Sequence, residues 1–363
     1  MDFTLSEASA DLAALTRRLL TDKATHDPHG TGGFDAVAWT ALGQAGVLDA
    51  ALPSSLGGGG FGLPEQCAVL TEIGRAVAAV PYLPSITMAA SALAEFGTPE
   101  LVDRWVLPVL RGERVLAVAL SGFTASGGRV SGTQTAVPFA AFAHGFLVAA
   151  SDEVFLVDAA AAGVSVQPQR TVDHADAGLL SLSEVPGVSL GDVGGWLRLR
   201  GTVGVCAQQL GVVERALELT AAYAAERKQF DHVIGGFQAV RQRLADAYLD
   251  VEAVRLTTLQ AAWQLTADVP AAEAVATAKF WAAEAGHRVA HTAVHVHGGV
   301  GIDVDHVVHR YFTAAKRLEF ELGPATTQLL ALGNLLAGPT PSWGVWGGRT
   351  PPNTNRPRRG PAG

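Results

Sequence analysis

The chain has little cysteine, few aromatic residues and no long apolar run, and each shortage excludes a class of protein. Its two cysteines, Cys67 and Cys206, lie far apart in apolar, alanine-rich segments, so we expect buried thiols and no disulfide framework. No window reaches the roughly 18 consecutive apolar residues that a membrane-spanning helix requires. The first residues open with acidic side chains and lack the basic and apolar regions of a signal peptide. We therefore expect a cytoplasmic protein with no membrane partner.

Basic residues are also fewer than acidic ones. The 26 Lys and Arg residues are outnumbered by 34 Asp and Glu residues, and the formal net charge is -8. No long basic run occurs before the C-terminal residues, which argues against a nucleic-acid partner but is compatible with a phosphate-bearing small ligand. With 48% hydrophobic and 17% charged residues among 363, the composition is that of a globular protein with a large core.

Three kinds of pattern follow one another along the chain. Residues 1–113 have the spacing of short amphipathic helices, residues 114–190 that of short antiparallel strands between turns, and residues 191–337 that of longer helices. The expected fold is α+β and mainly α: an N-terminal helical domain, a small middle β domain and a C-terminal domain of longer helices. Residues 338–363 are rich in Pro and Gly without periodicity, and we expect a disordered tail.

The glycine-rich segment at residues 56–62, LGGGGFG, is similar in composition to a phosphate-binding loop. A P-loop requires a following G-K-[ST] on a helix, and a Rossmann loop requires a preceding buried strand. Neither is present, since Leu63-Pro64-Glu65 follows the run. We interpret residues 56–62 as a flexible loop between two helices, with Pro64 in the first turn of the second helix.

The stretch from Tyr223 to Tyr248 combines the end of one helical pattern, a polar and aromatic break, and the start of another. Gly235 and Gly236 are expected to give the break its backbone freedom. The break presents one cation, two amides and two aromatic rings: Arg227, Gln229, Phe230, Phe237 and Gln238. Such a set suits an extended anionic ligand with planar rings. The alternative is that both phenylalanines are core residues and that Arg227 lies on a solvated helix face.

A second motif, at residues 295–301, reads HVHGGVG. Together with R-K-Q-F at residues 227–230 and Phe237-Gln238, it resembles the acyl-CoA dehydrogenase family over residues 5–336. That family has the same order of helical, β and helical domains, so the resemblance implies a four-helix bundle for residues 191–337. Its motifs are written R-x-x-F-G-x-x-I-x-x-F-Q and Q-x-x-G-G-x-G. This sequence departs from them at Asp231, where glycine is usual, and at His295, where glutamine is usual.

In the family, both motifs reach across a subunit interface to the adenosine pyrophosphate half of a partner's flavin adenine dinucleotide (FAD). The resemblance therefore implies FAD as the cofactor. The residues that it assigns to cofactor binding are Arg227, Gln229, Phe230, Phe237, Gln238, His295, Gly298, Gly299 and Gly301. The glycines would let the backbone approach the dinucleotide closely.

Four histidines lie within or beside the same predicted helix: His287, His291, His295 and His297. Imidazoles four residues apart on a helix can share a metal ion. There is no H-E-x-x-H motif and no carboxylate at the usual following spacing, and the resemblance implies no metal here. We therefore expect no metal site, and these side chains would instead line a helix facing the dinucleotide or a subunit contact.

The family removes two hydrogens from an acyl thioester: a glutamate takes the α proton and the flavin accepts the β hydride. Aligned with this sequence, the two known positions of that glutamate fall on Leu322 and on Gly201, neither of which can abstract a proton. Glu321 is a neighbouring candidate, displaced by a one-residue rotation about the helix. The T-E-P-x-x-G-S-D loop that contacts the flavin ring is also missing, since residues 118–132 run almost directly from one strand to the next.

The missing features act on a flavin in the same subunit, whereas the retained ones act on a neighbour's flavin. We therefore interpret the chain as the degenerate, non-catalytic partner in a heteromeric acyl-CoA dehydrogenase, similar to those that bacteria use on steroid side chains. The partners implied by the resemblance are an acyl-CoA substrate, a homologous catalytic subunit and electron-transferring flavoprotein. The alternatives are a self-sufficient homotetrameric acyl-CoA dehydrogenase and a flavin-free structural relative.

Overall fold

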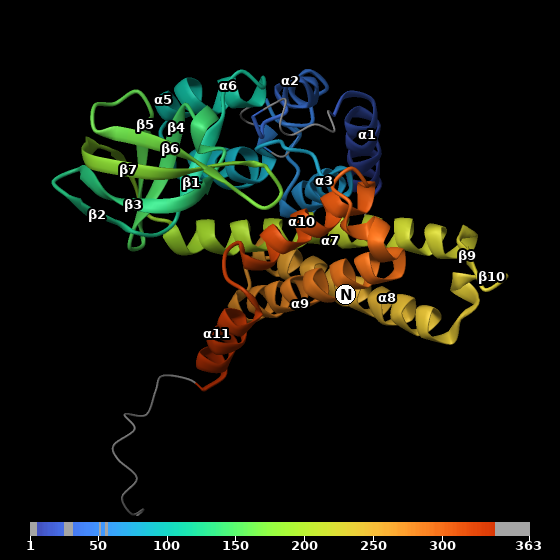
Figure 1. Cartoon of the computed structure of the whole chain (residues 1–363). Coiled ribbons are helices and arrows are strands. Elements are labelled where there is room, and N and C mark those ends of the chain that lie inside the picture. Colours follow the sequence, from blue (N-terminus) through green and yellow to red (C-terminus); the bar gives the residue numbers. More distant parts are fainter. Residues whose placement is uncertain (1–5, 25–31, 51, 55–56, 338–363) are drawn as a thin grey trace, which may run out of the picture.

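The computed structural model describes residues 6–24, 32–50, 52–54 and 57–337 (Figure 1). The tail at residues 338–363, expected to be disordered, lies outside the described residues, as does the start of the glycine run. Within the described residues, no helix is both long enough and apolar enough to cross a bilayer. Cys67 and Cys206 are free and buried as expected, and burial raises the pKa of each thiol to about 12.

The N-terminal part is helical, as the apolar spacing predicts. Its elements are α1 (Glu7–Lys23), α2 (Ala36–Gln44), α3 (Leu63–Ala76), the π-helical η2 (Leu83–Ala90) continuing into α4 (Ser91–Phe96), α5 (Pro99–Leu101), η3 (Val102–Val106) and α6 (Leu107–Leu110). The glycine run joins α2 to α3, and Pro64 lies in the first turn of α3, as expected. At Gly58 an added Cβ would lie 2.3 Å from the Leu52 carbonyl oxygen, so this glycine is needed for the loop to fold back on itself.

The middle part consists of two four-stranded sheets, ordered β1-β4-β5-β8 and β2-β3-β7-β6. The strands are β1 (Leu116–Ala119), β2 (Phe123–Ser126), β3 (Arg129–Pro138), β4 (Gly145–Ala150), β5 (Glu153–Asp158), β6 (Val164–Arg170), β7 (Asp176–Pro186) and β8 (Val188–Asp192). Their apolar faces enclose a separate core that includes Phe146, Phe155 and Leu180. The expectation of a wholly antiparallel module was wrong, because β1 pairs with β4 in parallel. The β2–β3 hairpin lies between them in sequence but belongs to the other sheet, so the chain re-enters the first sheet in the original direction.

Long helices form the C-terminal part, in the expected place. Its elements are α7 (Gly194–Glu226), β9 (Lys228–Gln229), β10 (His232–Val233), η5 (Ile234–Gly236), α8 (Gln238–Thr266), α9 (Ala272–His297), η6 (Gly298–Ile302), α10 (Val307–Phe320) and α11 (Ala325–Ala337). In Figure 1, α7 runs lengthwise beneath both the strands and the N-terminal helices. Domain boundaries at residues 113, 190 and 337 stay a prediction.

Helix α7 ties the parts together because it approaches α3 very closely. A Cβ added at Gly211 would lie 1.9 Å from the Thr71 carbonyl oxygen, and one added at Gly74 would lie 2.0 Å from that of Gln208. Only glycine fits at either crossing point. The middle of α7 is buried on almost every side, which explains its run of small and branched residues from Gly201 to Val213.

Candidate functional site

The break between α7 and α8 is a small hairpin followed by a 3-10 turn. Strands β9 and β10 pair Gln229 with His232. The two residues between them, Phe230 and Asp231, have φ values of +52° and +63°. Aspartate tolerates this left-handed region better than most residues, so it can replace the glycine usual at position 231.

The prediction that Gly235 and Gly236 supply the freedom of the turn was wrong, since neither has a positive φ among the described residues. Gly235 serves a different purpose. A Cβ added there would lie 2.9 Å from the Ala224 carbonyl oxygen, so its small size lets η5 lie against α7.

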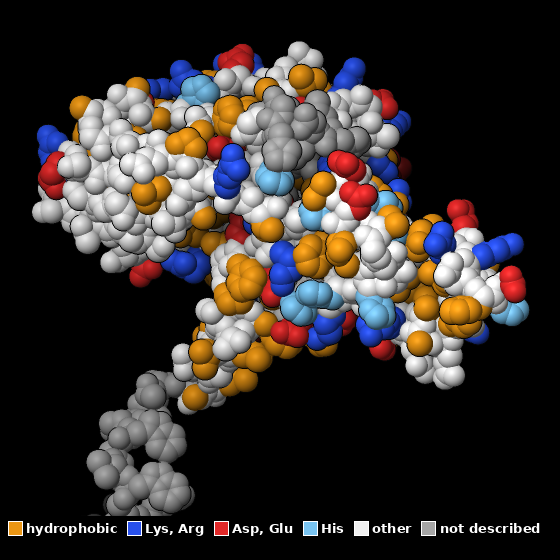
Figure 2. All heavy atoms as spheres, in the orientation of Figure 1, with side chains coloured by type: hydrophobic (Ala, Val, Ile, Leu, Met, Phe, Trp, Pro, Cys, Tyr) orange, Lys and Arg blue, Asp and Glu red, His pale blue; other side chains and the backbone are white. Residues whose placement is uncertain are grey.

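The side chains of the break face solvent. Phe230 is 86% exposed and Phe237 is 37% exposed, and their rings meet edge to face at 6.5 Å. The alternative that both are core residues is therefore wrong. Figure 2 shows hydrophobic side chains beside Lys and Arg side chains at this end of the molecule.

The polar groups of the break are available as well. Within the described part of the chain, the exposed Arg227 side chain makes no hydrogen bond or ion pair, so all its donors are free. Gln229 donates its side-chain amide to the Lys228 carbonyl oxygen at 2.9 Å, and Gln238 is exposed at the start of α8. An exposed cation beside exposed rings can bind an anionic, planar ligand.

The second motif lies where α9 ends. His295 is exposed on the last turn, and Gly298, which follows the helix, has a φ of +66°. Gly298 and Gly299 are exposed, and an added Cβ would meet nothing within 4 Å at either position. Gly301 is different, because a Cβ there would lie 2.9 Å from the Val294 carbonyl oxygen. The first two glycines leave open backbone, and the third is required by the turn itself.

The two motifs come together through a ring contact. His297 at the end of α9 stacks on Tyr223 of α7, with ring centroids 4.3 Å apart. Tyr223 is one helical turn before Arg227, whose N–H donates to the Tyr223 carbonyl oxygen at 2.9 Å. The structure therefore places the end of α9 beside the end of α7, as a shared ligand site requires.

The other histidines do not form a cluster suited to a metal. The rings of His287 and His291 lie 4.4 Å apart, and the His287 Nδ1 is 3.1 Å from the Lys316 ammonium. Across the described residues, no group of three or more His, Cys, Asp or Glu side chains could hold a metal ion.

The two positions examined for a catalytic glutamate meet in space. A Cβ added at Gly201 would lie 3.2 Å from a methyl carbon of Leu322 and 2.7 Å from the terminal carbon of Met88. Gly201 belongs to α7, Met88 to η2, and Leu322 to the turn after α10. Atoms of Met88 and Leu322 therefore surround the point at which a Cβ at position 201 would lie.

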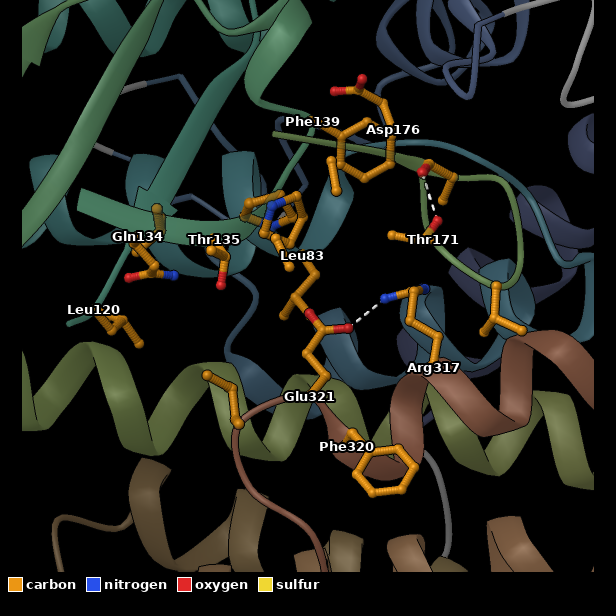
Figure 3. A pocket seen from close by; sticks show the side chains of 18 of the residues that line it. Leu83, Leu120, Gln134, Thr135, Phe139, Thr171, Asp176, Arg317, Phe320 and Glu321 are labelled. Atoms are coloured by element: carbon orange, nitrogen blue, oxygen red, sulfur yellow. Dashed lines mark hydrogen bonds and ion pairs between the residues drawn. The ribbon is translucent and has the colours of Figure 1, made fainter. Parts of the chain in front are cut away.

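This point adjoins a cavity of about 450 Å³ between the β sheets, η2 and the end of α10 (Figure 3). Its walls are mainly apolar, and they include Leu83, Leu120, Phe139 and Phe320. The loop that would enter from the β domain is short, since only residues 120–122 connect β1 to β2. A cavity of this size and character is typical of a small-molecule site.

Glu321 lies on the cavity wall, but its carboxylate is engaged. It forms an ion pair with Arg317, which also donates to Asp173 at 2.5 Å. Burial opposes the charge on Arg317, yet the two carboxylates outweigh it and raise the pKa of Arg317. Sequence reasoning missed Arg317 and Asp176 in the wall of this cavity and Asp173 as the ion-pair partner of Arg317, and burial raises the pKa of Asp176.

Family models match both helical parts of the chain. The acyl-CoA dehydrogenase N-terminal domain matches residues 6–113, and the C-terminal domain matches residues 200–336. The chain belongs to the acyl-CoA dehydrogenase family. It is 47% identical to acyl-CoA dehydrogenase FadE27 of Mycobacterium tuberculosis (strain ATCC 25618 / H37Rv), over 93% of this chain and 99% of that protein. It is 32% identical to acyl-CoA dehydrogenase FadE28 of the same strain, over 82% and 91% of the two chains.

Solved acyl-CoA dehydrogenases have the same fold. A chain of the ChsE4-ChsE5 complex from Mycobacterium tuberculosis matches with a TM-score of 0.88 and 48% identity, over 94% of this chain and all of that one. A chain of a Tcur3481-Tcur3483 steroid acyl-CoA dehydrogenase variant matches with a TM-score of 0.87 and 39% identity, over 92% and 99%. Close homologues of this chain therefore occur in complexes of two named components.

Proposed function

We propose that this chain is the non-catalytic subunit of a heteromeric, FAD-dependent acyl-CoA dehydrogenase and contributes to a neighbour's FAD site. One observation carries the proposal: the two aligned glutamate positions hold Gly201 and Leu322, and the three heavy atoms nearest to a Cβ at position 201 belong to Met88 and Leu322. Neither Gly201 nor Leu322 can accept a proton. The two motifs that would reach a neighbour's cofactor are, by contrast, exposed, and they retain the cation Arg227.

The exposed residues fit a dinucleotide. Arg227 has free donors for phosphate oxygens, Phe230 offers an uncovered ring face, and Gly298 and Gly299 leave the backbone open. Gln229, Phe237, Gln238 and His295 are exposed in the same two motifs and would complete the site. When bound, FAD supplies the hydride acceptor for dehydrogenation between the α and β carbons of an acyl-CoA thioester. This chain's own residues would bind and orient the cofactor.

The proposed partners are a homologous acyl-CoA dehydrogenase subunit, its acyl-CoA substrate and electron-transferring flavoprotein. Support for the first comes from the similar chains of the ChsE4-ChsE5 and Tcur3481-Tcur3483 complexes. The second of these is described as a steroid acyl-CoA dehydrogenase, which supports a steroid thioester as the substrate class.

A self-sufficient homotetrameric enzyme is the second candidate, because Glu321 does reach the cavity wall. Its carboxylate, however, is paired with Arg317, and removing a proton from substrate would require this pair to break. A flavin-free structural relative is the third candidate. It does not account for the exposed donors of Arg227, which have no partner among the described residues.

Replacing Arg227 tests the proposed role. In the complex with a homologous subunit, Arg227→Ala removes a charge-assisted contact worth about 1.5–3 kcal/mol, so flavin retention should weaken about ten- to a hundredfold. The melting temperature of the flavin-free chain should not change, because the side chain is exposed and unpaired among the described residues. Arg243→Ala, an exposed arginine further along α8, is the matched control and should retain flavin. Unchanged flavin content in Arg227→Ala, with loss of folding, would show a structural role and overturn the assignment.

A further inference from the structure

Three aromatic rings from three elements meet beside the candidate dinucleotide motifs. The His297 ring lies nearly parallel to that of Tyr223, at an interplanar angle of 20° and a centroid distance of 4.3 Å. The ring of His306, just before α10, lies 5.3 Å from that of His297. His297 is only 6% exposed, so it is positioned to act through its neighbours and not by touching a ligand.

The hydrogen bond of the His297 side chain shows which ring nitrogen carries the hydrogen. Its Nδ1 lies 2.8 Å from the Ala293 carbonyl oxygen, which can only accept, so Nδ1 carries the hydrogen in the neutral ring and Nε2 does not. Burial lowers the pKa of His297, the bond to Ala293 opposes this shift, and the neighbouring His306 adds to it. Tyr223 covers the ring from α7 with an uncharged face. The ring is therefore neutral at neutral pH.

Each ring of the Tyr223–His297 stack is connected through the backbone to one of the two proposed cofactor motifs. On one side, Gly298 follows His297 in the chain, and a Cβ added at Gly301 would lie 3.0 Å from the His297 Cβ. On the other side, Tyr223 accepts the hydrogen bond that ends α7 at Arg227. A shift of the His297 ring would move one motif relative to the other.

We propose that His297 is a positioning residue, whose stack on Tyr223 holds Gly298–Gly301 and the Arg227 turn in the single arrangement that retains the dinucleotide. The inference rests on the proposed function. Loss of the stack lets the two motifs move independently, so they no longer bind as one pre-ordered site. Protonation of His297 would place a positive charge on a poorly solvated ring that lies beside His306.

The pH dependence has a definite sign. The folded chain favours the neutral ring, so its contribution is complete above the ordinary histidine pKa of about 6.5 and declines as the pH falls toward the lowered value. Flavin retention should therefore weaken in mildly acidic solution. If the ring at position 297 could not titrate, flavin retention would not decline in this way as the pH falls.

The test uses the complex with a homologous subunit and follows flavin release by fluorescence at neutral and mildly acidic pH. His297→Ala should speed release about three- to tenfold at neutral pH, which is the range expected for one aromatic pair. His297→Phe keeps a flat ring without a titrating nitrogen, so it should restore slow release and remove the acceleration in acid. Phe280→Ala, which removes a ring contact with Trp281 elsewhere on the same helix, is the matched control and should release flavin as the wild type does.

The outcomes separate this inference from the proposed function. If Arg227→Ala speeds release while His297→Ala does not, the cofactor role stands and the positioning role is wrong. If His297→Phe retains the full acceleration in acid, titration of His297 is not its cause. If the wild-type complex holds no flavin, the proposed function and this inference fall together. Melting curves of both variants show whether a change in release reflects local order or general unfolding.

Discussion

At the scale of single residues, the most informative position is the one where Gly201, Met88 and Leu322 meet. Leu322 has a φ of +56°, which is uncommon for a branched side chain, and its methyl group nevertheless points toward α7. A glutamate at position 201 would bring its Cβ within 2.7 Å of the terminal carbon of Met88. The chain therefore lacks a base at this position, and Met88 fills the space that a side chain there would need.

This packing predicts non-additivity in a double-mutant cycle. Gly201→Ala adds a Cβ 2.7 Å from the terminal carbon of Met88, so the flexible end of that side chain must shift in the wild type. The shift should cancel part or all of the gain of about 1 kcal/mol from replacing a helical glycine. In a Met88→Ala background, where Met88 is no longer in the way, the same substitution should stabilise the fold by about 0.5–1 kcal/mol. Urea unfolding midpoints measure both effects. Equal stabilisation by Gly201→Ala in both backgrounds would show that Met88 does not fill the space.

The resemblance to the family predicted which positions lack a base, but not that these positions lie together. Gly201 and Leu322 are far apart in sequence, and nothing local to either indicates the other. The exposure of Phe230 was likewise ambiguous, because an aromatic residue beside a turn is as often buried as presented to a ligand. The left-handed turn at Phe230 and Asp231 was attributed to the wrong residues, since a pair of glycines nearby is the stronger local signal.

At the scale of elements, an ion cluster joins the end of α10 to the turn between β6 and β7. Arg317 of α10 binds Asp173 of that turn and Glu321 at the helix end, and the side chain of Asp173 is only 5% exposed. Arg317 and Glu321 of this cluster lie in the cavity wall in Figure 3. It connects two parts of the chain that sequence reasoning assigned to different domains.

Removing the cation should therefore be costly. Arg317→Met leaves two largely buried carboxylates without a partner, and we expect a loss of about 3 kcal/mol in the free energy of unfolding. Adding Asp173→Asn and Glu321→Gln to that variant should recover most of the loss, because the uncompensated charges disappear. Thermal melting of the single and triple variants checks this. Equal stability of Arg317→Met and the wild type would show that the cluster contributes nothing.

Most elements could be predicted from the period of the apolar residues, because helices and half-buried strands impose different periods on the sequence. The parallel pairing of β1 with β4 could not, since it depends on the β2–β3 hairpin joining the opposite sheet. Strand pairing is a long-range choice, and local sequence carries little information about it.

At the scale of the whole molecule, apolar side chains remain uncovered on the last helix. Helix α11 extends away from the body in Figure 1, and Leu330 and Leu336 are each 67% exposed. Apolar surface of this kind is typical of a protein–protein interface. Burial against a homologous subunit, as the proposed heteromer requires, would remove it from water.

The most direct test of the central claim compares the chain purified alone with the chain co-expressed with a homologous acyl-CoA dehydrogenase subunit. Flavin absorbance and acyl-CoA dehydrogenation are measured for both preparations. We predict little flavin and negligible activity for the chain alone, because the ring-contacting loop and both glutamates are missing, and bound flavin with turnover for the co-expressed complex. Stoichiometric flavin and turnover in a homo-oligomer of this chain would contradict the account, and Glu321→Gln would then show whether Glu321 is the base.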